Sequence, residues 1–456
     1  MKKYDVIIIG AGPAGVFSAI SMKEKNEKLK IAIIEKGKPL VKLVQSGGGR
    51  CNLSNKKANA KSCLPYYPRG SRFISHLFYQ YDVEKFCKWL YHSKVEVKIE
   101  NEDKIFLKSD DSKQLESIFM QKIKNYNIDL IKAKFIDFKI GLKSDSTNEN
   151  QFEVILQKYT NENFNKGIKE EIEEQIYYSN FLVISTGSNK EVLKKIKSKG
   201  IATYDFIPSL YGFSIKEIKE AKLAGITIKD VSCYLEIPFK DKDENNCKKE
   251  NNFDEIKNKK KGKIQKIIGD LLFTHEGLSG PVILKLSSYN AIDLYKSNFK
   301  GILHLDLFPY KNFEDLEKEV SEKCHKGSKT IKNICNELNI TENLWKFLLI
   351  KAEINNDMLA NQIIKEQIKK LVCIIKDFKV EINGKSMNKE EFVSAGGVEL
   401  SEIDKQCKSK KIDRLYFIGE ILNIDGITGG YNLQSCWTTA YICADSIAKL
   451  YYQNLK

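Results

Sequence analysis

No stretch of this sequence approaches the ~18 consecutive apolar residues that a membrane-spanning helix requires. The apolar stretch near the N-terminus covers only residues 6–9 and ends at Gly10, which is too short for a secretory signal peptide. None of the 11 cysteines forms a CxxC pair, which argues against a disulfide framework, a zinc site or a disulfide-reductase mechanism. We therefore expect a cytoplasmic protein with mostly free cysteines and no membrane partner.

Proline is scarce as well, at 8 of 456 residues, and with only 27 glycines the chain cannot be a collagen-like or proline-rich fibre. The length suggests several domains at ~150 residues each. Lys and Arg exceed Asp and Glu by 75 to 60, which leaves a net charge of +15. Because almost all of the basic residues are lysines interspersed with acids, a lysine-rich coding bias explains the charge better than a nucleic-acid partner.

Residues 4–36 have the pattern of a complete strand–helix–strand unit. Residues 6–9 form a short β-branched strand, the sequence GAGPAG (10–15) follows directly, and a second apolar strand covers residues 31–34. A GxGxxG motif alone is weak evidence. Here it follows a strand, opens a helix and is followed, 20 residues after Gly15, by Glu35. This combination predicts a dinucleotide-binding site.

The spacing of these glycines has a physical reason. Gly10 permits the tight turn, Gly12 lets a pyrophosphate approach the backbone, and Gly15 lets the helix pack close to the strand. The helix N-terminus offers free N–H groups to the phosphates, and Glu35 would accept hydrogen bonds from a ribose diol. The cofactor contacts predicted from this unit are Gly10, Gly12, Pro13, Ala14, Gly15, Glu35 and Lys36.

Three further segments are candidates for the rest of the cofactor site. QSGGGRCNLSN (45–55) suits a loop over a pyrophosphate or a flavin edge, although a surface turn has the same composition. An apolar strand at 181–185 ends in Thr-Gly, and another at 415–418 ends in Gly-Glu before a glycine-rich loop and a helix. The predicted contacts are Gly48, Gly49, Arg50, Cys51, Asn52, Thr186, Gly187, Gly419, Glu420, Gly429, Gly430, Tyr431, Asn432 and Leu433.

This arrangement resembles the two-dinucleotide-fold flavoproteins of the glutathione reductase type, and the resemblance implies non-covalently bound FAD. It implies that Glu420 binds the ribityl chain and that the last helix points its positive N-terminus at the pyrimidine end of the flavin. Tyr431 would either pack on the flavin ring or belong to the core. A second GxGxxG is absent, so NAD(P)H would be only a transient electron donor.

Four segments narrow the resemblance: GGGRCNLSN (47–55), GDLLFTHEGLSGPVILKLS (269–287), SAGGVELSEID (394–404) and LYFIGEILNIDGITGGYNLQSCWTTAY (415–441). Together they are similar to the bacterial YhiN/BaiN-like NAD(P)/FAD-dependent oxidoreductases, also described as aminoacetone oxidase family FAD-binding enzymes. The motifs occur in family order over nearly the whole chain. The chain departs from the family at residues 186–213, where a lysine-rich helix replaces a Gly- and Pro-rich stretch.

The resemblance implies an α/β fold, with a Rossmann-like FAD-binding domain, an inserted β-barrel and a small helical domain. We assign residues 1–188 and 394–456 to a split FAD-binding domain, residues 189–310 and 377–393 to a β-barrel-like domain, and residues 311–376 to a helical subdomain. Residues 378–385 predict a hairpin with an Asn-Gly turn. The charged, Asn-rich segment 241–263 predicts a mobile, solvated hairpin tip.

His275 is the catalytic candidate, because it alone of the five histidines lies in one of these motifs, THEGLSGP. It would donate a proton or hold a substrate in a cleft between the flavin domain and the insertion; the alternative is a structural histidine that holds the loop. No metal-ligand cluster is evident. We expect an FAD-dependent oxidoreductase acting on a small organic substrate, an amine or an enone/alkene. The alternatives are a flavin-dependent RNA-modifying enzyme and a flavoprotein without turnover.

Overall fold

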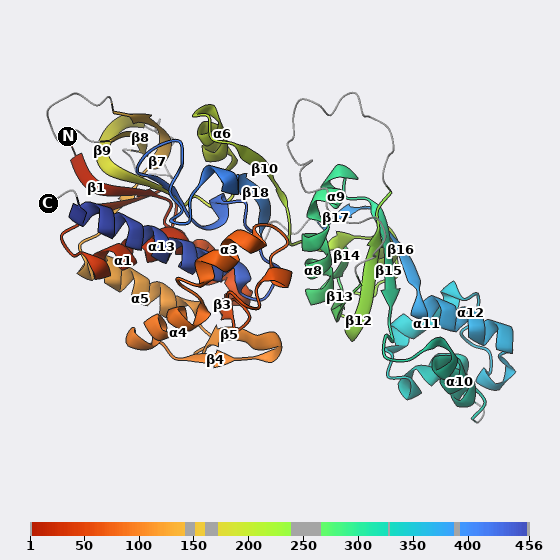
Figure 1. Cartoon of the computed structure of the whole chain (residues 1–456). Helices are drawn as coiled ribbons and strands as arrows, with labels where there is room; N and C mark the ends of the chain where they lie inside the picture. The colour runs from red at the N-terminus through yellow and green to blue at the C-terminus, as the bar shows by residue number, and fades with distance from the viewer. Residues whose placement is uncertain are drawn as a thin grey trace, which may run out of the picture. The chain divides into compact units, whose positions relative to one another are not determined.

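The computed structural model describes residues 2–141, 151–159, 172–238, 266–326, 329–386 and 393–453. The predicted hairpin tip at 241–263 therefore lies outside the described residues. The chain forms two compact units (Figure 1). Unit 1 comprises residues 1–206 and 393–456, and unit 2 comprises residues 207–392.

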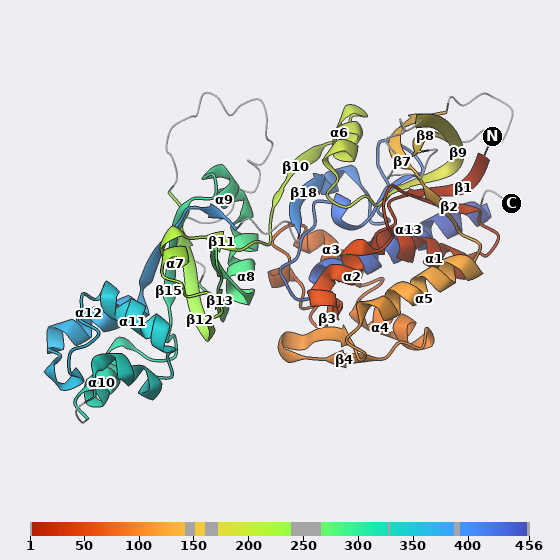
Figure 2. The ribbon, with the colours of Figure 1, turned by 180° about the vertical axis from the view of Figure 1, so that it is seen from behind.

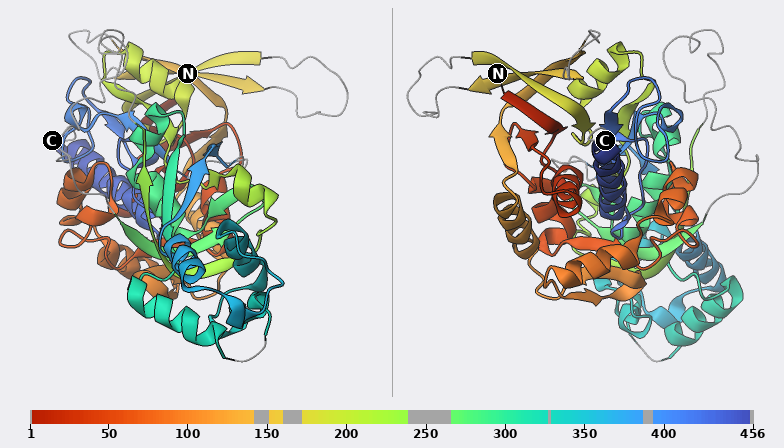
Figure 3. Two further views of the ribbon diagram at one scale, coloured as in Figure 1. Left: turned by 90° about the vertical axis from the view of Figure 1, so that its right-hand side faces the viewer. Right: turned by 60° about the vertical axis from the view of Figure 1, so that its left-hand side comes forward.

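The central sheet of unit 1 has seven strands in the order β6-β2-β1-β9-β8-β7, with β19 paired to β9. Their bounds are β1 (Lys2–Ile9), β2 (Ile31–Glu35), β6 (Asp129–Lys132), β7 (Lys134–Ile140), β8 (Phe152–Tyr159), β9 (Ile172–Ile184) and β19 (Leu415–Phe417). β1 pairs in parallel with β2 and β9, and its residues 6–9 are fully buried, which explains the unbroken apolar run. In Figure 3, β8 and β9 project from the sheet as a two-stranded ribbon.

Helices cover this sheet through an aromatic core. α1 (Pro13–Lys25) and α13 (Tyr431–Gln453) lie side by side (Figures 1 and 2). The Phe17 ring packs edge-on against Trp437, with ring centroids 5.5 Å apart, and the Phe86 ring stacks on Trp437 with centroids 4.8 Å apart. The remaining helices of the unit are α2 (Val41–Gln45), α3 (Ser71–Phe78), α4 (Val83–His92), α5 (Ser112–Asn125) and α6 (Lys190–Ser198).

Two small sheets complete unit 1. β3 (Asn52–Asn55), β5 (Lys104–Leu107) and β4 (Val97–Ile99) form an antiparallel sheet, and β10 (Thr203–Pro208) pairs with β18 (Ser394–Val398). The boundary expected at residue 188 lies at residue 206 instead. Residues 189–206 stay with unit 1 because β10 hydrogen-bonds to β18, which leads into the C-terminal part of the same unit.

Unit 2 contains a second seven-stranded sheet, in the order β16-β15-β12-β13-β14-β11-β17. The strands are β11 (Phe213–Ser214), β12 (Thr227–Glu236), β13 (Ile267–Phe273), β14 (Gly277–Ser279), β15 (Gly301–Asp306), β16 (Phe378–Ile382) and β17 (Gly384–Lys385). β16 and β17 stand at opposite ends of this order although only Asn383 separates them, so the sheet must curl like a barrel. The predicted hairpin at 378–385 is therefore wrong: β16 pairs with β15, and β17 pairs with β11.

The helices of unit 2 are α7 (Lys216–Glu220), α8 (Pro281–Tyr289), α9 (Ala291–Lys296), α10 (Phe313–Cys324), α11 (Glu342–Lys351) and α12 (Lys365–Lys376). α10 begins where Asn312 accepts a hydrogen bond from the Asp315 N–H at 2.7 Å, an N-cap that fixes the start of the helix. Trp345 is fully buried and donates to the Ile331 carbonyl at 2.8 Å. In the described part of the chain, every helix is too short or too polar to cross a membrane.

Candidate cofactor site

The turn between β1 and α1 has the geometry that its glycines predict. Gly10 has a φ of +102°, and a Cβ there would lie 2.6 Å from the Ser185 carbonyl oxygen. A Cβ on Gly15 would lie 2.1 Å from the Gly10 carbonyl oxygen. Ser185, at the end of β9, donates its hydroxyl to the carbonyls of Ile9 and Gly10 at 2.8 and 3.0 Å. The end of β9 thus holds the turn in place.

Gly12 is different from these two glycines, because a Cβ added to it meets no described atom within 4 Å. Gly12 is the N-cap of α1, and no side chain caps the helix there. The first N–H groups of α1 are therefore not capped by a side chain, and the positive end of the helix attracts anions. A pyrophosphate fits this position, and any larger side chain at residue 12 would compete with it.

Glu35 lies beside this turn at the end of β2. One carboxylate oxygen accepts the Ala11 N–H at 2.9 Å, and the other accepts the Gly37 N–H at 2.9 Å. Each oxygen retains acceptor capacity for a ribose hydroxyl. The carboxylate is thus oriented by the same loop that presents the helix N-terminus, while the neighbouring Lys36 is exposed.

The Thr-Gly and Gly-Glu pairs meet because β9 and β19 are parallel neighbours that end at the same edge. A Cβ on Gly187 would lie 3.2 Å from a carboxylate oxygen of Glu420, and one on Gly419 would lie 2.8 Å from the Ala14 Cβ. The Thr186 hydroxyl is buried and has no hydrogen-bond partner among the described residues. A buried hydroxyl without a partner is costly, so it is a fitting contact for a bound polar group.

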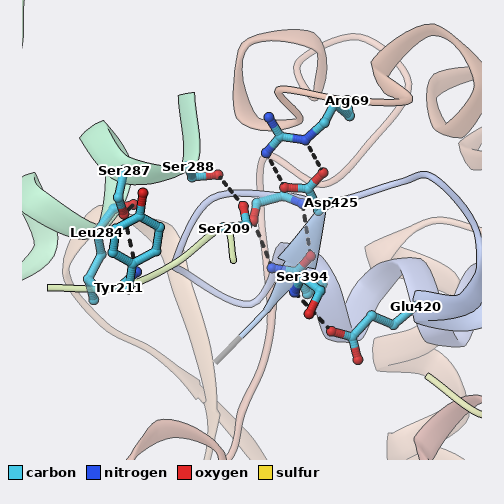
Figure 4. A network of polar contacts seen from close by, with 11 residues as sticks. Arg69, Ser209, Tyr211, Leu284, Ser287, Ser288, Ser394, Glu420 and Asp425 are labelled. Atoms are coloured by element: carbon cyan, nitrogen blue, oxygen red, sulfur yellow. Dashed lines mark hydrogen bonds and ion pairs between the residues drawn. The ribbon is translucent and has the colours of Figure 1, made fainter. Parts of the chain in front are cut away.

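Glu420 has two protein partners at this edge. Its carboxylate accepts the Ser394 N–H at 3.2 Å (Figure 4) and lies 3.2 Å from the Lys42 ammonium. Lys42, from α2, and Ser185 were not among the predicted residues. Ser185 could have been found from the sequence, because it directly precedes the Thr-Gly pair. Lys42 could not, because nothing in the sequence near it indicates an ion pair with Glu420, 378 residues away.

The start of α13 packs against the strand that follows the glycine run at 47–49. Gly430 has a φ of +93°, and a Cβ there would lie 2.4 Å from the Ser54 carbonyl oxygen. The Ser54 hydroxyl donates to Gln434 at 2.6 Å, and the Trp437 indole N–H donates to the Leu53 carbonyl at 3.0 Å. The predicted residues Gly429 and Gly430 are therefore brought to β3, the strand that begins at the predicted residue Asn52. Asn432 instead holds the loop before α13, because its amide donates to the Gly426 carbonyl and accepts the Gly426 N–H, both at 2.8 Å.

Tyr431 belongs to the core of unit 1. It is 3% exposed, its ring stacks on Tyr66 with centroids 4.8 Å apart, and the Tyr67 hydroxyl donates to its carbonyl at 2.7 Å. Of the two roles expected for this side chain, core packing is the one with observed contacts. Contact with the flavin remains a prediction.

The glycine run itself and its flanking residues divide into two groups. Gly48 and Gly49 face open space, since a Cβ on either meets nothing within 4 Å. Arg50 instead forms ion pairs with Glu100 and Asp110, and its guanidinium lies 4.4 Å from the Phe106 ring centre. Its predicted contact with a pyrophosphate or a flavin edge would require it to exchange those partners.

Cys51 is fully buried. Burial raises the pKa of its thiol to about 11, so the nucleophilic thiolate is scarce near neutrality. This state does not suit a redox-active cysteine. No group of three or more His, Cys, Asp or Glu side chains in the described ranges has the arrangement of a metal site.

His275 lies in unit 2, in the turn between β13 and β14, and is exposed. The turn is held by Thr274, whose N–H and hydroxyl both donate to the Gly277 carbonyl, at 2.8 and 3.2 Å. His275 therefore is not needed to hold its loop. Its catalytic role remains a prediction. His304, by contrast, is a buried sheet residue whose ring lies 2.7 Å from Asp377 and 3.2 Å from Glu236.

The glycine turn, the helix N-terminus and the polar groups at the ends of parallel strands define a Rossmann-type dinucleotide-binding protein, and the family to which the chain belongs makes it an FAD-dependent oxidoreductase. The chain belongs to the family described as HI0933-like protein Rossmann domain, whose model matches residues 4–446. The observed fold and this membership confirm the predicted fold class and the expected family resemblance.

Among curated proteins, the chain is 25% identical over 464 residues to "Ribosomal RNA dihydrouridine synthase" of Haemophilus influenzae, covering 98% of this chain and all of that protein. It is also 25% identical to the Escherichia coli protein of the same name, covering 98% of each chain. It is 24% identical to "3-dehydro-bile acid delta(4,6)-reductase" of Clostridium scindens, covering 97% of this chain and 98% of that one. Among solved structures, a 3-ketosteroid delta1-dehydrogenase from Sterolibacterium denitrificans has a TM-score of 0.47 at 9% identity, covering 99% of this chain and all of that one.

Proposed function

We propose that this protein uses FAD to reduce a carbon–carbon double bond that is conjugated to a carbonyl group. Dihydrouridine is uridine with its C5–C6 double bond reduced, next to the C4 carbonyl. The name of the bile-acid reductase describes double bonds conjugated with a 3-oxo group. One reaction class thus covers the named activities of three relatives that match nearly the whole chain.

The observation that carries the cofactor part of this proposal is the open space above Gly12 at the N-terminus of α1. FAD held there would supply a hydride to the carbon β to the carbonyl. The α carbon would gain a proton, and NADH or NADPH would supply the electron pair, so that the substrate gains two hydrogen atoms in all. His275 is our candidate for the proton donor because it is exposed and not used to hold its own turn.

We infer that a uridine in RNA is the substrate, and that a small enone is the second candidate. This order of the two candidate substrates is the reverse of the one that the sequence composition favoured. It rests on the names of two relatives that align with this chain over their whole length. The small enone rests on the third relative.

The test incubates the purified protein anaerobically with NADPH or NADH and either unmodified ribosomal RNA made by transcription or a 3-oxo-4,6-diene steroid. Nucleoside mass spectrometry would detect dihydrouridine, and loss of the dienone absorbance would detect steroid reduction. We expect dihydrouridine in the RNA. Steroid reduction alone would establish the second candidate. Flavin that no donor reduces would support a flavoprotein without turnover and contradict both.

A further inference from the structure

One stretch of unit 1 departs from the mixed charge pattern of the rest of the chain. Residues 56–81 contain five Lys or Arg residues and no Asp or Glu. The chain as a whole has 60 acids in 456 residues, so an acid-free stretch of this length is unusual for it. The same stretch contains six aromatic residues; Tyr67, Phe78 and Tyr81 are buried, which leaves Tyr66, Phe73 and Tyr79 at least partly exposed. Basic residues interleaved with aromatic ones are typical of surfaces that bind single-stranded nucleic acid.

The structure folds this stretch into one compact surface element. Asn59 organises residues 56–63, donating its amide to the Lys56 carbonyl at 2.8 Å and accepting the Lys61 N–H at 3.1 Å. The Ser75 hydroxyl of α3 donates to the Ala60 carbonyl at 3.0 Å. The turn and the helix are therefore fixed against each other, and their basic side chains belong to the same part of unit 1.

Most of these basic side chains are available to a partner. Lys56, Lys61 and Arg72 are exposed, and none forms an ion pair with a described acid. Lys57 lies 3.4 Å from Asp103, but both side chains are about two-fifths exposed, and such a pair contributes only ~0–1 kcal/mol. The buried Arg69 does not belong to this group, because Asp425 neutralises it.

An aromatic platform adjoins these cations. Tyr66 is partly exposed and its ring is nearly parallel to that of Tyr431, at 6°. The ammonium of Lys57 lies 5.7 Å from the centre of the Tyr66 ring. Tyr431 is the first residue of α13, and the Tyr66 carbonyl accepts the Ile427 N–H at 3.0 Å. The platform is therefore attached to the loop that leads into the helix expected to face the flavin.

We propose that residues 56–72 form a surface that binds single-stranded RNA next to the reduced base, with Lys56, Lys61 and Arg72 at phosphates and a base stacked at Tyr66. This inference rests on the proposed RNA substrate and names the surface that would hold it. Phosphate contacts give affinity that falls with salt, and stacking on an aromatic ring accepts any base. An RNA that presents an unpaired uracil to the cofactor requires both the phosphate contacts and the stacking contact.

The test measures binding of the FAD-loaded, full-length protein to a fluorescein-labelled single-stranded oligouridylate, by fluorescence anisotropy over a series of salt concentrations. The first variant combines Lys56→Gln, Lys61→Gln and Arg72→Gln. We expect it to bind roughly tenfold more weakly, with the slope of log affinity against log salt smaller by about 2, since each single-strand phosphate contact contributes about 0.7.

The matched control removes the same charge from another part of unit 1. Lys190, Lys194 and Lys197 are exposed on α6, and their combined replacement by glutamine should leave binding close to that of the wild type. If RNA binding weakens equally in the two triple variants, or weakens in neither, the protein binds RNA through another surface and this inference is overturned. If the wild type binds neither the oligouridylate nor ribosomal RNA, the proposed RNA substrate itself fails.

The stacking role has its own variants. Tyr66→Leu should weaken binding roughly tenfold, whereas Tyr66→Phe, which keeps the ring, should bind like the wild type. Flavin absorbance per protein should be unchanged in both, because neither removes a predicted cofactor contact. Equal affinity for Tyr66→Leu and wild type would remove the platform from the proposal. If the protein binds anionic phospholipid vesicles but not RNA, and the first triple variant loses the vesicle binding, the surface binds a membrane. That result would overturn the inference.

Discussion

Arg69 and Asp425 form a buried, two-point ion pair in unit 1. The Nε and Nη2 groups of Arg69 donate to the two carboxylate oxygens of Asp425 (Figure 4). The side chains are only 6% and 1% exposed. Arg69 lies just before α3, and Asp425 lies in the glycine-rich loop before α13. The pair thus ties that loop to a segment more than 350 residues earlier in the chain.

We predict that Asp425→Ala lowers the free energy of unfolding by about 3–5 kcal/mol, because it leaves a buried guanidinium without its counter-charge. The loop that it frees leads into α13, so the protein should also retain less FAD. Chemical denaturation and the flavin-to-protein absorbance ratio would measure the two effects. Glu96→Ala is the control, since Glu96 pairs with Lys108 at the surface and should cost at most about 1 kcal/mol. Similar losses for the two variants would contradict the role of burial.

Gly12→Val should abolish FAD binding without unfolding the protein. The added side chain meets no protein atom within 4 Å of its Cβ but enters the space expected for the pyrophosphate. Acid precipitation followed by chromatography would measure the released FAD, and circular dichroism the fold. Gly384→Ala, where a Cβ also meets nothing, is the control and should keep its FAD. A Gly12→Val protein with a full complement of FAD would refute the site.

His275→Ala should retain FAD and slow substrate reduction by roughly 10²-fold, the usual scale for losing a general acid. The comparison is made by single-turnover kinetics with the pre-reduced flavin, so that donor binding does not enter. His92→Ala removes an exposed histidine of unit 1 and should leave the rate unchanged. Full activity in His275→Ala would show that the proton comes from another group.

Cys51 should resist alkylation up to about pH 9, while the exposed Cys373 reacts. Burial raises the pKa of Cys51 from 9.0 to about 11, so its thiol stays protonated in the folded protein when an exposed thiol ionises. The unfolded chain releases that proton first, so this group's contribution to stability is complete below pH 9 and falls between pH 9 and about 11. Iodoacetamide labelling with peptide mapping would follow both cysteines. Rapid native labelling of Cys51 would contradict its burial.

The amino-acid sequence by itself determined the strand–helix–strand unit at residues 4–36. The apolar run at 6–9, the spacing of the three glycines and the position of Glu35 are local features, and the physics of a tight turn and a helix N-terminus allows one geometry for them. The N-cap at Asn312 is equally local, because its side chain accepts a hydrogen bond from an N–H three residues further on.

Only the tertiary structure decided which distant segments complete the site. The contact of Gly430 with Ser54, the approach of Lys42 to Glu420 and the ion pair of Arg69 with Asp425 join residues separated by hundreds of positions. The Asn-Gly at 383–384 likewise resembled a hairpin turn, yet its flanking strands lie at opposite edges of a sheet. Periodicity and turn composition report local preference, whereas partners are chosen by the packing of whole elements, which no local pattern encodes.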